Sequence, residues 1–247
     1  MRAGAFVIPF LLATANTVFA EGFAVYDYGA RGSALGGAML ARNPDASAVA
    51  HNPALLTRLP GKRALGGVTA IANSGHINWN GNGREGHTNA KDAVFPIPHA
   101  YYTQQINDDW FLGIGEFSRF GLGVEYPSNW PGRFNVYDIS IQTASVNPVV
   151  AWKATDKLSL AFGAEFLYAK LGMKKRVDIP VGPGASFEVD SNIRDADDSS
   201  LGFNLATHYQ FNDQWAIGFQ YRSPIRITAE GNVRFGYLGP DNQQLQS

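Results

Sequence analysis

The residues best suited to chemistry form a row at alternate positions that is apolar along its length and basic at its end: Leu167, Ala169, Leu171, Met173 and Lys175. Alternate residues of a β-strand share one face, so a strand here would present an apolar surface with a cation at one end. Such a surface suits binding, because burying an alkyl chain gains roughly 0.8 kcal/mol per methylene. Alternatively, Lys174, Lys175 and Arg176 only solvate the top of the strand.

The sequence shows no motif for catalysis or metal binding. The histidines have no ligand spacing, and no GxSxG elbow occurs (His51, His76, His87, His99, His208). The chain contains no cysteine, and its glycine-rich stretches lack the strand, loop and helix with a lysine that hold phosphate. We therefore predict no enzymatic activity, no metal and no cofactor. A net charge of −1 also argues against a nucleic-acid partner.

The N-terminus carries an export signal. Met1-Arg2 is followed by an apolar stretch from Ala5 to Ala15 and by Val18-Phe19-Ala20 ahead of Glu21. The apolar stretch is shorter than the roughly 20 residues that a membrane anchor would need. We predict a signal peptide at residues 1–20.

The strand pattern indicates a membrane barrel. From Leu158 and again from Leu201 and Trp215, apolar residues alternate with small or polar ones, and aromatic residues lie near the ends of these runs. Each run approaches the roughly 9 to 11 residues that a tilted strand needs to cross a bilayer. A soluble sandwich would also alternate, but its strands are usually about 5 to 6 residues long.

The connections support the barrel and define its strands. Short turns at 107–109, 154–156 and 212–213 contrast with long loops near 80–94, 126–135 and 176–199. The resulting seven candidate strands are 63–79, 94–105, 110–125, 136–152, 158–177, 200–211 and 214–235. Because an open edge is not tolerated in lipid, we expect this chain to be the front part of a longer protein.

Two Asn-Pro pairs precede the strands. Asn is a good helix N-cap and Pro fits the first helical position, so Asn43-Pro44 and Asn52-Pro53 each predict a short helix.

Over essentially the whole mature chain, the sequence resembles the FadL-like transporters of long-chain fatty acids and hydrocarbons in Gram-negative outer membranes. The resemblance is carried by NPAL after a small-residue segment, by IND followed by a glycine-rich strand ending in FGL, and by YRSPI. It implies an all-β membrane protein, the N-terminal half of an antiparallel outer-membrane β-barrel of about 14 strands. Residues 21–60 would form a helical plug, or hatch, and residues 61–247 the partial barrel.

The strand 110–125 breaks its own pattern, because Glu116 and Ser118 fall on the face that Trp110 and Leu112 present to lipid. A carboxylate toward lipid is costly, so the strand should bend or bulge there. The family has an inward kink in the matching strand that opens the wall sideways. By resemblance, the kink would comprise Ser118, Arg119, Phe120 and Gly121, with the hatch segment Asn52, Pro53 and Ala54 approaching it.

The resemblance also implies a function. A long-chain fatty acid or other hydrophobic compound would bind along Leu167, Leu171, Met173 and Lys175, pass Ser118, and leave sideways into the membrane. Lys175 matches a basic position that is typically Arg in the family, so it would contact a carboxylate as a point charge. Expected partners are outer-membrane lipid and lipopolysaccharide, with a monomer as the full-length state. The alternatives are an aromatic hydrocarbon channel and a general porin.

Overall fold

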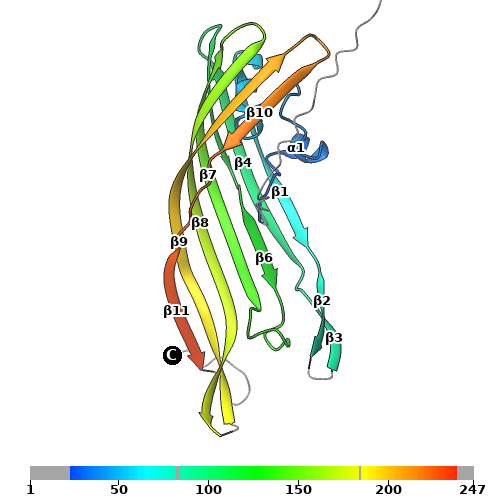
Figure 1. Cartoon of the computed structure of the whole chain (residues 1–247), viewed down its shortest axis with the longest axis vertical. Helices are drawn as coiled ribbons and strands as arrows, with labels where there is room; N and C mark the ends of the chain where they lie inside the picture. Colours follow the sequence, from blue (N-terminus) through cyan, green and yellow to red (C-terminus); the bar gives the residue numbers. More distant parts are fainter. Residues whose placement is uncertain (1–22, 82–83, 184, 238–247) are drawn as a thin grey trace, which may run out of the picture.

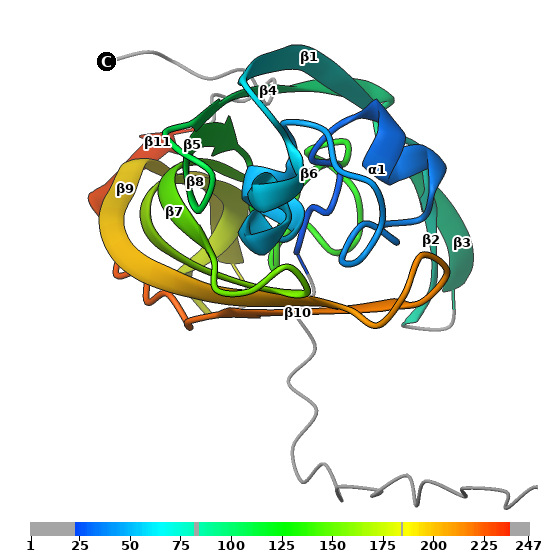
Figure 2. The same cartoon turned by 90° about the horizontal axis from the view of Figure 1, so that it is seen from above.

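The computed structural model describes residues 23–81, 84–183 and 185–237, so the expected signal peptide lies outside it. These residues form a tall, curved antiparallel sheet (Figure 1) that encloses short N-terminal helices when seen from above (Figure 2). The strands are β1 (Lys62–Asn73), β2 (His76–Gly81), β3 (Arg84–Asn89), β4 (Ala93–Gln105), β5 (Trp110–Phe117), β6 (Gly121–Glu125), β7 (Asp138–Lys153), β8 (Leu158–Gly182), β9 (Ala185–Gln210), β10 (Ala216–Arg222) and β11 (Glu230–Tyr237).

The main sheet has the order β1-β4-β5-β7-β8-β9-β10, with every neighbouring pair antiparallel. β6 follows β5 along the same edge of β7, and β11 pairs with the part of β9 beyond β10. These seven strand positions confirm the prediction of a half-barrel sheet. β2 and β3 form a separate hairpin within the region predicted as the loop 80–94 and the end of the first strand.

The alternation of side chains follows the sequence pattern. On β8, Leu160, Phe162, Phe166 and Tyr168 are exposed on the convex face, whereas the residues between them turn toward the concave face and are mostly buried. β9 and β10 expose Leu201, Leu205, Ile217 and Phe219 in the same way. An apolar band on the outside of a curved antiparallel sheet is typical of a barrel that faces lipid. None of the helices in the described ranges is long and apolar enough to cross a membrane.

The short turns were predicted correctly, but two of the three predicted long loops contain strands: the β2–β3 hairpin in 80–94, and the extensions of β8 and β9 in 176–199. The segments between β4 and β5, between β7 and β8, and between β9 and β10 are tight turns, and 126–135 is a loop. By contrast, β8 and β9 continue through most of 176–199, reaching 25 and 26 residues. The sequence favoured a loop here because the stretch is rich in Gly, Pro, Asp and Asn. The alternation at Val177, Ile179 and Val181 and at Phe187 and Val189 was the signal for strands that this prediction passed over.

The N-terminal helices are α1 (Ala30–Ala34), α2 (Ala48–His51) and the 3₁₀ helix η1 (Pro53–Arg58). Asn52 opens η1 as predicted, because its Oδ1 accepts a hydrogen bond from Ala54 N at 3.0 Å and Pro53 takes the first position. The prediction for Asn43-Pro44 was wrong, since the next helix begins at Ala48. There, Asp45 accepts the backbone N–H of Ser47 and delays the helix start.

The core joins these helices to the sheet. Val49, Leu55 and Leu56 are almost completely buried and pack with inward-facing side chains of the strands, among them Phe111, Phe117 and Val149. Gly113 permits this contact, because a Cβ on it would lie 2.8 Å from both Val49 and Leu56. The helices therefore sit directly against the concave wall.

Candidate functional site

The wall is interrupted between β5 and β6. Phe117 pairs with Ser145 and Gly121 with Gln142, so Ser118, Arg119 and Phe120 lie opposite only two residues of β7. This is one residue too many for a regular ladder, as in a β-bulge. The bend that Glu116 and Ser118 predicted is therefore present, and we call Ser118–Gly121 the kink.

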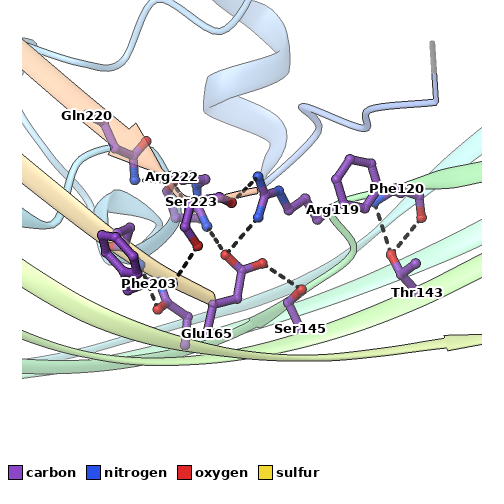
Figure 3. Close-up of polar contacts among 12 residues, drawn as sticks. Arg119, Phe120, Thr143, Ser145, Glu165, Phe203, Gln220, Arg222 and Ser223 are labelled. Carbon is purple, nitrogen blue, oxygen red and sulfur yellow. Dashed lines mark hydrogen bonds and ion pairs between the residues drawn. The ribbon is translucent and has the colours of Figure 1, made fainter. Parts of the chain in front are cut away.

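Side chains replace the missing ladder bonds at the kink. Thr143 Oγ1 accepts the Phe120 N–H at 3.0 Å and donates to Phe120 O at 2.7 Å, as Figure 3 shows. Ser118 Oγ donates to Thr143 O at 2.5 Å. The kink thus has a defined conformation, fixed to β7 through Thr143.

Residues Phe23–Val25 pair with the other edge of the kink, the edge that does not face β7. Val25 N donates to Arg119 O and Gly121 N donates to Phe23 O, both at 2.9 Å. These two bonds flank an isolated antiparallel bridge between Ala24 and Phe120. We call Phe23–Val25 the N-terminal clasp. Sequence reasoning missed it, because nothing local links residues so far apart in the chain.

A cavity of about 680 Å³ lies beside the kink. β4 pairs with β5 only as far as the Ala100–Glu116 pair, and β6 has no ladder with β4. The cavity is lined by residues from both faces of the wall, mostly apolar: Ile71, Phe95 and Ile97 from the inner face, and Pro96, Pro98, Glu116 and Tyr168 from the outer face. Two prolines are tolerated here because this part of β4 has one neighbouring strand.

The kink residues divide between two environments. Ser118, Phe120 and Gly121 line the cavity in the wall, together with Val25 of the clasp. Arg119 points the other way, into the interior, and is 6% exposed. The kink therefore separates the interior of the curved sheet from the opening in its wall.

Arg119 belongs to a buried charge cluster that sequence reasoning also missed (Figure 3). Glu165 on β8 is completely buried and pairs through Oε2 with Arg119 at 3.4 Å and Arg222 at 2.7 Å. Ser145 Oγ donates to its other oxygen at 2.9 Å. Glu165 is the one charged residue in the inward row Ser159, Ala161, Gly163 and Glu165, and this was the signal in the sequence for a buried charge. The sequence did not identify its partners, because they come from distant parts of the chain.

The cluster also reaches the helices. Arg222 Nη2 donates to Ala50 O at 2.6 Å, and Gln220 Nε2 donates to the same carbonyl at 3.3 Å. Arg119 Nη2 donates to Ser223 O at 3.3 Å. Kink, wall and the end of α2 are therefore joined through one carboxylate and two guanidinium groups.

The hatch residues named from the sequence lie where the helices meet β9. Asn52, Pro53 and Ala54 are buried, and Asn52 Nδ2 donates to Leu40 O and to Thr207 O on β9. Within the described ranges, the backbone of the kink is bonded to the clasp and to β7 rather than to Asn52. The approach of these hatch residues to the kink stays a prediction.

The expected binding row runs along the inner face of β8. Leu167 is 1% exposed, and Leu171, Met173 and Lys175 are partly buried above it. Lys174 pairs with Asp138 at 2.6 Å and Arg176 lies 3.9 Å from Asp190. Among the described residues, no carboxylate lies within ion-pairing distance of Lys175, which leaves that amine available for an anionic ligand.

The loop between β6 and β7 is pinned to β9 by an ion pair that should respond to pH. Arg133 donates to both oxygens of Glu188, and this bond holds the pKa of Glu188 below its usual range. Because the pKa of Glu188 is lower in the folded state, the ion pair contributes its full stability at pH values above the unfolded-state pKa. That stability is lost as the pH falls through the folded-state pKa. We expect hydrogen exchange at the Arg176 N–H, which donates to Arg133 O, to quicken below about pH 4 after correction for intrinsic rates. A Glu188→Gln variant should show the faster exchange already at neutral pH.

Comparison with known sequences gives a consistent result. A family described as outer membrane protein transport protein (OMPP1/FadL/TodX) matches residues 11–244. Outer membrane protein P1 of Haemophilus influenzae is 26% identical over 225 residues, covering 74% of this chain and 49% of the relative. The long-chain fatty acid transport protein of Escherichia coli O6:H1 is 24% identical over 211 residues, covering 77% and 47%. The chain thus spans about half the length of the curated relatives it matches.

Solved structures give the same fold. The toluene transporter TodX of P. putida matches with a TM-score of 0.69 and 19% identity, over 88% of this chain and 61% of that chain. A FadL homologue of Pseudomonas aeruginosa matches with a TM-score of 0.66 and 20% identity, over 87% and 56%. At these identities the likeness establishes the β-barrel fold.

Proposed function

Since the chain belongs to the outer membrane protein transport family (OMPP1/FadL/TodX), as its resemblance predicted, we propose that it takes up long-chain fatty acids or similar hydrophobic compounds through the bacterial outer membrane. Members of this family are transporters and channels of the outer membrane rather than enzymes. The observation that carries the proposal is the apolar cavity of about 680 Å³ beside the kink, which is lined from both faces of the wall.

The route begins at the end of the sheet that carries the loop 126–135 and the extensions of β8 and β9. A hydrophobic compound adheres there, then moves along the row Leu167, Leu171 and Met173, with Lys175 attracting an anionic end. Burial of the alkyl chain supplies the affinity, at roughly 0.8 kcal/mol per methylene. The compound moves down its own free-energy gradient, so no energy source is needed.

The plug and kink control the exit. Residues 21–60 act as the hatch, of which α2 and η1 pack against the concave wall. The clasp occupies the free edge of the kink and must leave it before the cavity can connect the interior with the bilayer. The compound then exits past Ser118, Phe120 and Gly121 into lipid. This lateral exit avoids water, where an alkyl chain is unfavourable.

Uptake of a labelled long-chain acid tests the function directly. Cells that produce the full-length protein should accumulate the acid several-fold faster than cells carrying an empty vector, because the outer membrane is the barrier that the protein removes. Accumulation is measured by filtration at early times. Equal rates in the two strains would refute the proposal.

A general porin is distinguished by liposome swelling. The full-length protein in liposomes should give no swelling with small sugars, since the hatch would close the barrel; α2 and η1 already pack against the concave wall. Rapid swelling would favour a porin. An aromatic hydrocarbon channel remains the alternative within the family, because solved relatives include toluene transporters. Mass spectrometry of compounds that copurify with the full-length protein separates these ligand classes.

The exposed outer surface supports a proposal for the remaining partners. The exposed apolar band of β8, β9 and β10 would contact membrane lipid, and the extended parts of β8 and β9 would lie at the level of lipopolysaccharide. We propose a monomer as the full-length state.

A further inference from the structure

We propose that Arg119 and Arg222 form a binding station for the carboxylate of the transported compound, at the interior side of the kink. This inference rests on the proposed function and deepens it, because it assigns the substrate to hydrophobic acids rather than to neutral hydrocarbons. The station differs from the expected site at Lys175, which lies ten residues farther along β8 than Glu165. At about 3.3 Å per residue that separation is roughly 33 Å.

The charges of the cluster do not balance. Two guanidinium groups share the single carboxylate of Glu165, and both use the same oxygen, Oε2. Burial lowers the pKa of nearby His51 to about 4, so this histidine is neutral at pH 7 and adds no further charge. The cluster therefore carries one excess positive charge. A buried excess charge is unfavourable, and an anionic ligand would neutralise it.

Both guanidinium groups are accessible from a cavity. A space of about 370 Å³ is lined by Arg119, Arg222 and Gln220 of the wall and by Tyr26, Tyr28 and Leu40 of the N-terminal segment. Arg119 lies between Ser118 and Phe120, which line the larger cavity in the wall. A carboxylate held here would have its alkyl chain next to the exit.

The arginines also retain donors for a ligand. Each uses Nη1 for Glu165 and Nη2 for a backbone carbonyl, of Ser223 for Arg119 and of Ala50 for Arg222. A guanidinium group has five N–H donors, and bonds from Nη1 and Nη2 to one acceptor each use two. The Arg222 guanidinium carbon lies 5.2 Å from the centre of the Phe117 ring, and that of Arg119 lies 5.1 Å from Phe120. These contacts orient the charges and place apolar surface beside them.

The test compares a long-chain acid with the alcohol of the same chain length. Binding to the full-length protein is measured at pH 8 in a Lys175→Gln background, so that the other basic site does not contribute. Arg119→Gln should lower the acid affinity roughly tenfold and leave the alcohol affinity unchanged, as expected for loss of a charge-assisted bond. Glu165→Gln should have the opposite effect and raise the preference for the acid, because it increases the excess positive charge.

If Arg119→Gln and Glu165→Gln change the preference for the acid in opposite directions, a merely structural role is excluded. Damage to the site would weaken the binding of both the acid and the alcohol. The control Arg63→Gln removes an exposed arginine at the start of β1 and should not alter the preference. An unchanged acid preference in Arg119→Gln, or equal loss of both ligands, would overturn the inference and leave the proposed transport intact. Should Glu165→Gln not fold, Arg119→Gln alone decides. Absence of any hydrophobic ligand binding by the parent protein would overturn both proposals.

Discussion

A disulfide between positions 24 and 120 is expected to reduce uptake of a long-chain acid to that of cells lacking the protein. The bonds from Val25 N to Arg119 O and from Gly121 N to Phe23 O flank the Ala24–Phe120 bridge, which makes these two residues a non-hydrogen-bonded antiparallel pair. The Cα atoms of such a pair are about 4.5 Å apart, within the range that a disulfide spans. Ala24→Cys with Phe120→Cys would therefore lock the clasp on the kink and keep the exit closed.

The natural chain has no cysteine, so the engineered pair cannot form a disulfide with another residue of this segment. Each single substitution should retain uptake in the absence of the crosslink, and a reductant should restore uptake by the double variant. Formation of the disulfide is checked by the mass of the linked peptides. Full uptake by the oxidised double variant would mean that the clasp stays on the kink during transport, and the gate as proposed would be wrong.

Replacement of Glu165 by Gln should cause a large loss of stability. The Glu165 side chain is 0% exposed, and the side chains of Arg119 and Arg222 are 7% and 11% exposed. Gln keeps the size of the side chain but removes the charge, so two buried guanidinium groups lose their counter-ion. Breaking a buried ion pair on one side costs about 3 to 5 kcal/mol. We expect the free energy of unfolding of the full-length protein to fall by about that amount, as measured by tryptophan fluorescence in guanidinium chloride.

A matched control is Asp156→Asn in the turn between β7 and β8. Asp156 also pairs with a cation, Lys153, at 2.8 Å, but its side chain is 95% exposed. Water screens this pair, so the substitution should not change stability measurably. If Glu165→Gln were as stable as the parent, the guanidinium groups would have to be solvated by water in the interior. The view of the cluster as a buried ionic link that stabilises the contact between wall and helices would then fail.

Several features could be predicted because they depend on local patterns. The period of two from Leu158 and Leu201 identifies strands and their lipid-facing sides, since successive side chains of a strand point to opposite faces. The polar residues Glu116 and Ser118 on an outward face predicted a bend or bulge in this strand, because an unpaired carboxylate toward lipid is costly. The assignment of the kink to Ser118–Gly121 came from the family resemblance. Asn52-Pro53 likewise marks the start of η1 through bonds within a few residues.

Other features required the tertiary structure. The extensions of β8 and β9 are rich in Gly, Pro, Asp and Asn, which favours a loop, and their strands are formed by pairing with each other. The start of α2 at Ala48 rather than Pro44 depends on the turn made by Asp45. Neither the pairing of the two strands nor the hydrogen bond to Asp45 can be read from a sequence pattern.

The sequence by itself determined the half-barrel sheet, the outward faces of its patterned strands and the bend in the strand that begins at Trp110. Only the tertiary structure decided that Phe23–Val25 clasp the kink and that Glu165 meets Arg119 and Arg222. The physical reason is the range of the interactions. Alternation and capping act between neighbours in the chain. Glu165 lies 46 residues from one arginine and 57 from the other, so only the folding of the curved sheet brings them together.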